Sequence, residues 1–337
     1  MDKTELWLAL ARCEFLDCAE KEILAEKLDN LESLTVLSID DISMLVGRVI
    51  RTRCWKPNTL PELVQHDWVV MRRYGIQFVP IMAAEYPPLL REIHDPPFIV
   101  FWRGCLPDPE IPPVAIVGTR TPSGNGVLAA ARLGHECAEC GIPVVSGLAR
   151  GIDTFAHRGA VEVGGTSVAV LACGLESVYP RSNIRLAARI IECGGCLIGE
   201  YPPGTEPMQY HFPQRNRIIS GISRAVIVVE APEKSGALIT ADFALEQGRD
   251  MYVVRDALRS AHSKGTRMLA DDGATVITSA YNFLTLWGYE CRTENSIRPV
   301  TDDRSSSEKD TSISIRTGKQ LAFDFRKEMN LHMDKVH

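Results

Sequence analysis

The sequence lacks the features of membrane-spanning and exported proteins. None of its 337 residues falls in an apolar run approaching the roughly 18 positions of a membrane-spanning helix. The amino terminus, Met1–Glu5, has neither the basic start nor the apolar run of a secretory signal. Ten cysteines are sparse for a disulfide scaffold in so long a chain, so we expect reduced thiols. These absences predict a soluble, globular, cytoplasmic protein with no membrane partner.

The motifs of common nucleotide-dependent enzymes are missing too. The sequence has no G-x-x-x-x-G-K-[ST] loop and no G-x-S-x-G elbow. The dinucleotide fingerprint fails because Ala129 stands where a third glycine is needed, and Ser146 and Gly147 replace the acid that binds a ribose. Asp153 and His157, four residues apart, raise the alternative of a hydrolase, but Asp153 is explained more simply as a helix cap. We therefore expect no catalytic residue and no cofactor.

Two C-x-x-C pairs, Cys137/Cys140 and Cys193/Cys196, raise the alternative of a zinc or redox site. The residues between the pairs far outnumber the roughly 15 to 20 that separate the halves of compact zinc sites. Both pairs also precede expected strands, which places them away from the glycine-rich turns described below. We therefore expect no metal.

Positive charge is scarce in total but locally concentrated. The net charge of −6 and pI near 5.8 argue against a general nucleic-acid coat but allow a confined basic site. The excess of acidic residues lies in residues 1–113. Two later windows, residues 177–191 and 207–229, contain no carboxylate. Their basic residues are Arg181, Arg185, Arg189, His211, Arg215, Arg217 and Arg224.

The chain divides into three regions. Residues 1–68 predict a small helical domain. Its expected helices are 5–13, 18–28 and 40–45. Residues 69–289 begin with short proline-hinged runs and then alternate apolar β-branched runs with helix-length segments. Residues 290–337 are polar at first, and we expect them to be largely disordered.

The alternation in the second region predicts an α/β fold. The apolar runs are residues 114–117, 143–145, 167–172, 196–198, 225–229, 251–254 and 275–277. Continuously apolar strands separated by helices indicate a doubly wound, mostly parallel sheet that is covered on both faces. An all-helical interpretation of these short runs is the alternative.

Glycine, small hydroxyl and arginine residues follow several of the expected strands. They include Gly118, Thr119, Arg120, Ser146, Gly147, Arg150, Asp153, Tyr179, Arg181, Asn183, Ser235 and Gly236. Ligands of open parallel sheets bind beyond the carboxyl ends of the strands, and glycine amides at helix starts suit phosphate groups. The alternative is that these glycines only permit tight turns.

The segment 210–219 is the sharpest single feature. Arg215 and Arg217 fall near the start of an expected helix, where a cation opposes the helix dipole at roughly 0.3 to 1 kcal/mol. An anion should compensate, and the alternative is internal pairing with Glu200 or Glu230. Aromatic residues accompany the basic ones, a combination that holds single-stranded nucleic acid, unless each ring packs in the core. They are Tyr179, Tyr201, Tyr210 and Phe212.

Together these segments closely resemble the bacterial DprA/Smf family, DNA-processing protein A, from about Tyr86 to about Ala274. The motifs that carry the resemblance are residues 86–90 (YPPLL), 118–120 (GTR), 146–153 (SGLARGID), 179–180 (YP) with Asn183, 212–219 (FPQRNRII), 230–231 (EA) and 235–241 (SGALITA). The resemblance implies an extended Rossmann-like domain preceded by a small helical, SAM-like domain. It also implies a homodimer without enzymatic activity that binds single-stranded DNA, protects incoming DNA and loads RecA recombinase during natural transformation and recombination.

The resemblance also assigns site residues. The phosphate-binding pocket of the family corresponds to Gly118, Arg120, Ser146, Gly147, Arg215, Asn216 and Arg217. The wider candidate interface adds Thr119, Arg150, Asp153, Tyr179, Arg181, Asn183, Phe212, Ser235 and Gly236. The sequence departs from the family at Arg255-Asp256, where Pro-Gly is usual, and at Arg267, which replaces an asparagine. Few residues follow Gly288, so we expect no complete carboxyl-terminal winged helix.

The runner-up interpretation is a nucleotide-binding, Rossmann-like enzyme of the phosphoribohydrolase type. Such enzymes carry a P-G-G-x-G-T-x-x-E loop with an essential glutamate. The corresponding stretch here, residues 231–240, is followed by Phe243 at the glutamate position. A third interpretation, a protein-interaction scaffold, leaves the basic turns unexplained.

Overall fold

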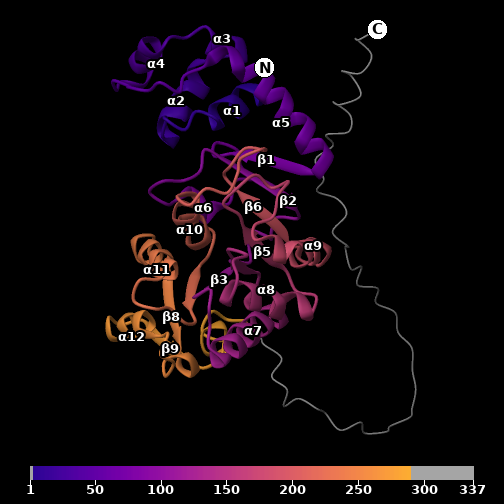
Figure 1. Ribbon diagram of the computed structural model, residues 1–337, viewed down its shortest axis with the longest axis vertical. Coiled ribbons are helices and arrows are strands. Elements are labelled where there is room, and N and C mark those ends of the chain that lie inside the picture. Colours follow the sequence, from indigo (N-terminus) through magenta and orange to yellow (C-terminus); the bar gives the residue numbers. More distant parts are fainter. Residues whose placement is uncertain (1–2, 290–337) are drawn as a thin grey trace, which may run out of the picture. The chain divides into compact units, whose positions relative to one another are not determined.

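The computed structural model describes residues 3–289, and residues 4–74 form helices joined by short loops (Figure 1). These elements are α1 (Thr4–Ala11), α2 (Cys18–Lys27), α3 (Leu31–Thr35), α4 (Ile39–Val46), the 3-10 turn η1 (Pro57–Thr59) and α5 (Leu60–Tyr74). Capping boxes at Asp17, Asn30 and Ser38 begin α2, α3 and α4. The three expected helices are confirmed, and α3 and α5 are additional. Because α5 runs unbroken through residue 68, the change from helices to strands comes at Gly75, which has a φ of 66°.

Within residues 3–289, nine strands form one sheet in the order β1-β2-β6-β5-β4-β3-β7-β8-β9. They are β1 (Ile76–Pro80), β2 (Ile99–Gly104), β3 (Val114–Val117), β4 (Val144–Ser146), β5 (Ser167–Val170), β6 (Cys196–Gly199), β7 (Ala225–Val228), β8 (Asp250–Val254) and β9 (Thr275–Ile277). Strands β3 to β9 pair in parallel, whereas β1 and β2 extend the sheet antiparallel beside β6. Every residue of β3 to β7 is buried, which confirms the doubly wound, mostly parallel fold.

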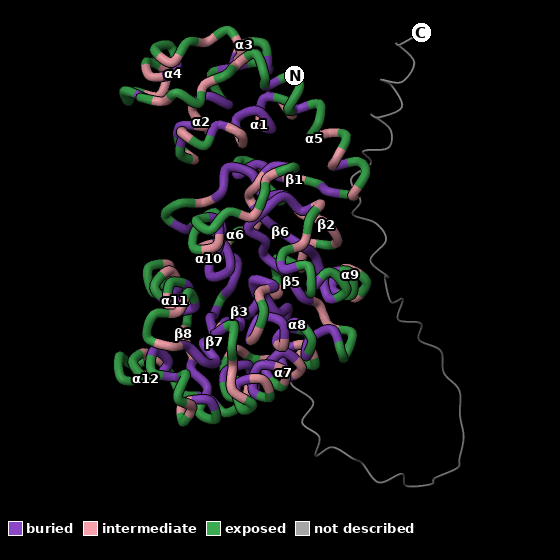
Figure 2. The backbone as a smooth tube through the Cα atoms, viewed as in Figure 1, coloured by how far each residue is buried: buried purple, intermediate pink, exposed green. Residues whose placement is uncertain are grey.

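Helices cover both faces of this sheet. They are α6 (Pro88–Arg91), α7 (Gly124–Glu139), α8 (Ile152–Glu162), α9 (Ile184–Glu192), α10 (His211–Gly221), α11 (Gly236–Glu246), α12 (Lys264–Asp271) and α13 (Tyr281–Leu284), with 3-10 turns η2 (Arg181–Asn183) and η3 (Arg255–Ala257). One apolar core lies under α7, α8 and α13, and another under α9, α10 and α11. Figure 2 shows the buried strands inside and the exposed helix surfaces outside.

The sheet has a topological switch point between β3 and β7. From β3 the chain continues to β4, β5 and β6 on one side, and from β7 it continues to β8 and β9 on the other. The turns that follow these two neighbouring strands therefore leave in opposite directions. Open α/β sheets bind their ligands at such a point.

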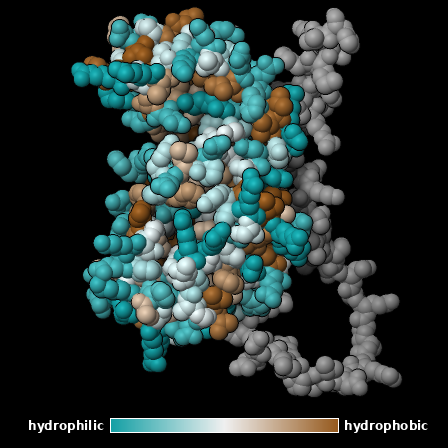
Figure 3. All heavy atoms as spheres, in the orientation of Figure 1, coloured by the Kyte–Doolittle hydropathy of each residue, from teal (hydrophilic) through white to brown (hydrophobic). Residues whose placement is uncertain are grey.

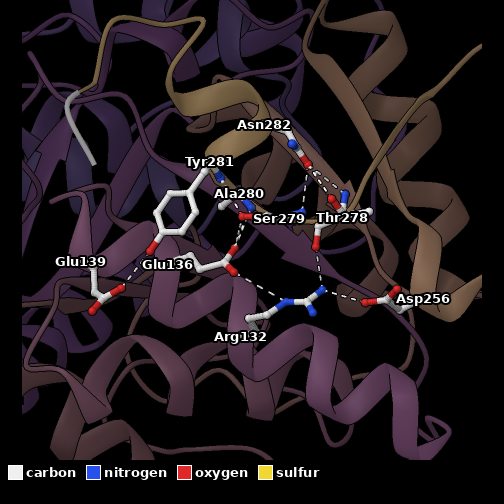
Figure 4. Close-up of polar contacts among 9 residues, drawn as sticks. All are labelled: Arg132, Glu136, Glu139, Asp256, Thr278, Ser279, Ala280, Tyr281 and Asn282. Atoms are coloured by element: carbon white, nitrogen blue, oxygen red, sulfur yellow. Dashed lines mark hydrogen bonds and ion pairs between the residues drawn. The ribbon is translucent and has the colours of Figure 1, made fainter. Parts of the chain in front are cut away.

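The segment after β9 is fastened to α7 by polar contacts (Figure 4). The Glu136 carboxylate accepts hydrogen bonds from the Ser279 hydroxyl at 2.9 Å and the Ala280 amide at 2.7 Å. Arg132, one turn earlier on α7, donates to Asp256 at 2.9 Å and to the Thr278 carbonyl at 2.7 Å. These contacts fix the segment between β9 and α13 against α7.

The surface, the helices and the cysteines can be compared with the expectations of no membrane span and of reduced thiols. On the face drawn in Figure 3 hydrophilic residues predominate, and hydrophobic ones occur in small separate groups. No helix among residues 3–289 is long and apolar enough to cross a membrane.

Eight cysteines in this range have free thiols, but Cys140 is disulfide-bonded, so the expectation of reduced thiols is wrong at that residue. The predictions about residues 290–337 lie outside the described residues.

Candidate nucleic-acid interface

An aromatic pair lies where three turns at the carboxyl ends of the strands converge. Phe212, on the first turn of α10, has its ring centroid 5.5 Å from that of Tyr179, which precedes η2. The guanidinium of Arg120, in the turn after β3, lies 5.6 Å from the Phe212 centroid. Tyr179 is 51% exposed. Residues far apart in the sequence thus form one accessible aromatic and basic surface.

Three arginines of this edge have exposed side chains without polar partners. Arg120, Arg150 and Arg181 are all exposed, and none of their side chains has a hydrogen bond or ion pair among residues 3–289. Arg120 and Arg150 belong to the turns after β3 and β4, and Arg181 begins η2. We call these three arginines, with Tyr179 and Phe212, the arginine–aromatic surface. Its free cations suit phosphates and its rings suit unstacked bases.

Arg215 has a different place from the one expected. It is only 4% exposed, and its Nη1 donates to the Gly147 carbonyl at 2.8 Å and to the Val170 carbonyl. Burial lowers its pKa to about 10, and the nearby Asp153 opposes that shift. Because the guanidinium is enclosed by the ends of β4 and β5, direct contact with a phosphate is not supported. Arg215 instead holds these strand ends in place.

Arg217 forms an internal ion pair with Glu200, which is the alternative that the sequence left open. Its Nη1 and Nη2 each donate to one oxygen of Glu200 at 2.7 Å, and its Nε donates to Asp95 at 3.0 Å. Burial alone would lower its pKa, but the Glu200 charge and hydrogen bonds raise the pKa above its usual value. The compensating anion for this cation therefore comes from the protein, through a bidentate pair.

Two glycines of the turns lie where a larger residue would collide with its neighbours. A Cβ at Gly118 would lie 2.5 Å from Cγ1 of Ile152, and one at Gly147 would lie 2.5 Å from Nη2 of Arg215. Thr119 is buried, and its amide donates to the Glu230 carbonyl at 2.7 Å. Close packing therefore accounts for glycine at these two positions.

Several expected site residues build the loops instead of lining the surface. The buried Ser146 hydroxyl donates to the Ile116 carbonyl at 2.6 Å. The Asp153 carboxylate accepts from the amides of Gly147 at 3.1 Å and Ala149 at 3.3 Å, and burial raises its pKa. These contacts shape the turn that presents Arg150.

Asn183 stabilises an unusual backbone conformation in the same turn. Leu148 has a φ of 57°, a left-handed value that costs an L-residue on the order of 1–3 kcal/mol. Asn183 Nδ2 donates to the Leu148 carbonyl and to the Thr154 hydroxyl, each at 2.9 Å. Local sequence patterns gave no signal for this left-handed leucine, since glycine is the usual residue there.

The remaining expected residues connect α10 to α11. Asn216 Nδ2 donates to the Gly236 carbonyl at 3.1 Å. The Ser235 hydroxyl accepts from the Ala237 amide at 3.2 Å and so caps α11. Ser235 and Gly236 follow β7, on the opposite side of the switch point from the turn of Arg150, and Asn216 contacts Gly236 from α10.

Sequence reasoning missed the role of Glu230. This residue follows β7, is 0% exposed, and binds Ser123 at the start of α7. The sequence indicates Glu230 as part of the family motif 230–231 and as an alternative partner for the arginines of α10, but not as a partner of Ser123. The available signal was an acidic residue directly after a buried strand, at the edge where the glycine-rich turns meet.

Known proteins resemble this chain in sequence and structure. The family model for DNA recombination-mediator protein A matches residues 77–288. The DNA processing protein DprA of Bacillus subtilis is 41% identical over 210 residues, which cover 62% of this chain and 70% of that protein. The X-ray structure of DNA processing protein A from Streptococcus pneumoniae has a TM-score of 0.65 and 32% identity, covering 86% of this chain and 99% of that one.

A second solved structure bears on the ligand. DNA processing protein A from Helicobacter pylori, described for its single-stranded DNA binding mode, has a TM-score of 0.56 and 27% identity. The similarity covers 64% of this chain and 98% of that one. All residues of the arginine–aromatic surface lie within the range that the family model matches. The chain therefore belongs to the DNA recombination-mediator protein A family, which includes the DprA and Smf proteins.

Proposed function

We propose that this protein binds single-stranded DNA on the arginine–aromatic surface. The observation that carries the proposal is the Tyr179–Phe212 ring pair with Arg120 against it, accompanied at the same edge by exposed Arg150 and Arg181; no hydrogen bond or ion pair holds any of these three guanidinium groups within residues 3–289. Base stacking on aromatic rings contributes about 1–3 kcal/mol per base and tolerates any sequence. The Helicobacter pylori relative, whose published description names single-stranded DNA binding, supports the same ligand.

In this proposal, Arg120, Arg150 and Arg181 contact phosphates, and Phe212 and Tyr179 stack on bases. Arg215 and Arg217 act as positioning residues, because the contacts that they make are to the protein itself. A base in duplex DNA is already stacked on its neighbours and cannot pack on these rings without being unpaired. The surface should therefore prefer single strands.

The wider biological role in this proposal follows from family membership. The protein acts by binding, without catalysis, in the cytoplasm as a homodimer. It protects incoming single-stranded DNA and loads RecA recombinase onto it during natural transformation and recombination. The names of its relatives, DNA processing and DNA recombination-mediator proteins, support the part of this role that concerns DNA processing and recombination.

A fluorescence anisotropy titration tests the binding proposal. Labelled single-stranded oligonucleotide, duplex of the same sequence and mononucleotide are titrated with the full chain. We expect tightest binding to the single strand, at least tenfold weaker binding to duplex, or about 1.4 kcal/mol, and the weakest to mononucleotide. Preference for the mononucleotide would instead favour the nucleotide-handling enzyme.

Phe212→Ala is the variant that isolates stacking. It removes a ring that is part of the surface but carries no charge, so it should weaken single-strand binding by about 1–3 kcal/mol with little effect on its salt dependence. Phe155→Ala is a suitable control, because Phe155 is a partly buried aromatic of α8 outside the ring pair.

A further inference from the structure

The position where a sheet of this kind usually holds a ligand phosphate is filled by the protein itself. That position lies at the switch point, against the amino terminus of the helix that follows the first strand. Here the helix is α7, which begins directly after its cap, Ser123. The group found there is the carboxylate of Glu230, which follows β7 across the switch point.

Both oxygens of this carboxylate are bound. Oε2 of Glu230 accepts hydrogen bonds from the Ser123 amide at 2.9 Å and the Ser123 hydroxyl at 3.0 Å. Oε1 accepts a hydrogen bond from the Ser260 hydroxyl, in the loop after η3. Glu230 is 0% exposed and has no ion pair with a cation among residues 3–289. The polar groups that surround this carboxylate are therefore an amide and two hydroxyls. Neutral dipoles of this kind also surround a phosphate bound at the start of a helix.

The Glu230 carboxylate lies directly against the first turn of α7. A Cβ at Gly126, in the first turn of α7, would lie 2.1 Å from Oε2 of Glu230. The backbone of Glu230 also takes part, because its carbonyl accepts the Thr119 amide at 2.7 Å. Glu230 thus both closes the start of α7 and holds the turn that presents Arg120.

We propose that Glu230 is a built-in anion that occupies the phosphate position at the switch point and so excludes free nucleotides from it. The consequence for specificity rests on the proposed function: a phosphate cannot enter the sheet edge, and a DNA strand is left to bind the arginine–aromatic surface beside it. Glu230 is then a specificity-determining residue that acts without touching the strand.

Removing this carboxylate should convert the closed position into an anion site. Glu230→Ala leaves the Ser123 amide and the start of α7 without an anion, whereas Glu230→Gln keeps the position filled by a side chain of the same shape. Isothermal titration calorimetry with inorganic pyrophosphate should show only weak binding to wild type and Glu230→Gln, at the exposed arginines of the arginine–aromatic surface. Glu230→Ala should bind pyrophosphate at least tenfold more tightly than either.

Acetate matches the atoms that the alanine substitution removes. It should compete with pyrophosphate for Glu230→Ala and raise the melting temperature of that variant alone. Glu233→Ala is the matched control, because Glu233 is an exposed carboxylate nearby that pairs with Lys264 at the surface. This control should bind pyrophosphate no more tightly than wild type and should not respond to acetate.

A folded Glu230→Ala protein that binds pyrophosphate no better than wild type would overturn the proposal. If this variant is unfolded in plain buffer, added acetate should restore its circular dichroism spectrum, and a failure to do so equally contradicts a replaceable internal anion. The titration contains no DNA. Its outcome therefore stands apart from that of the single-strand titration, and either proposal can fail without the other.

Discussion

At the scale of single residues, burial decides what an arginine does. Arg120 and Arg215 carry the same guanidinium at the same edge of the sheet, but Arg120 is exposed and Arg215 is 4% exposed. The first is free to exchange water for a phosphate, and the second already donates to two carbonyls. Sequence spacing placed both at this edge. It could not show which one would be enclosed, because the enclosing groups come from β4 and β5.

His157 adds a pH dependence at the same scale. It is fully buried with Nδ1 2.7 Å from the Ser167 hydroxyl, and burial, followed by the Arg215 charge, lowers its pKa from 6.5 to about 3. The folded protein therefore binds this proton more weakly than the unfolded chain does. The contribution of His157 to stability is complete above about pH 6.5 and is lost as the pH falls toward about 3.

Denaturant titrations between about pH 7 and about pH 4 test this dependence. The free energy of unfolding should fall more steeply with decreasing pH in wild type than in His157→Gln. The difference between the two slopes should correspond to the uptake of at most one proton per molecule on unfolding. His262→Gln, a change at an exposed histidine, should follow wild type. Equal slopes for wild type and His157→Gln would contradict the assignment.

At the scale of elements, the parallel strands could be predicted from the sequence, but the order in which the strands pair could not. Runs such as Ala225–Val228 are apolar on both faces, which distinguishes a central strand from a surface one. The order that puts β2 next to β6 depends on contacts far apart in the sequence, and no local pattern contains it. The same holds for the site: strand ends predicted which turns converge, but not the Arg217–Glu200 pair that anchors α10.

Arg217→Ala should lower stability without changing the salt dependence of DNA binding. Glu200, with 18% of its side chain exposed, would lose a bidentate partner. Breaking a fully buried pair costs about 3–5 kcal/mol, and the partial exposure here reduces the expected loss to about 2 kcal/mol. Differential scanning calorimetry should show a melting temperature lower by about 3 °C. A weaker salt dependence of DNA binding with unchanged stability would instead show that Arg217 contacts DNA.

At the scale of the whole molecule, charge is divided between regions. Acidic residues are in excess in residues 1–113, whereas the arginine–aromatic surface is drawn from the later turns. An acidic protein can therefore hold an anionic strand if the strand meets only the basic edge. The exposed apolar side chains near the sheet edge formed by β9, Val276 at 37% and Leu286 at 82%, are available for contact with a second copy.

The proposed homodimer is tested by sedimentation equilibrium on the full chain. The mass should be about twice the 37.3 kDa of one chain at micromolar concentration. Leu286→Glu places a charge in the exposed apolar group and should shift the equilibrium toward monomer, with Leu128→Glu, a change at an exposed leucine on α7, as control. A wild-type protein that is monomeric throughout would contradict the proposal.

The salt dependence of single-strand binding tests the central claim most directly. Binding constants are measured over a range of salt concentrations for wild type, Arg120→Ala, Arg150→Ala and Arg181→Ala. Arg189→Ala is the control, because that exposed arginine pairs with Glu192 on α9. The slope of the logarithm of the binding constant against the logarithm of the salt concentration should be smaller by about 0.7 for each phosphate contact that a surface variant loses. Each surface variant should keep its melting temperature, and the control should keep the wild-type slope. Unchanged slopes in all three surface variants would show that DNA does not bind on the arginine–aromatic surface.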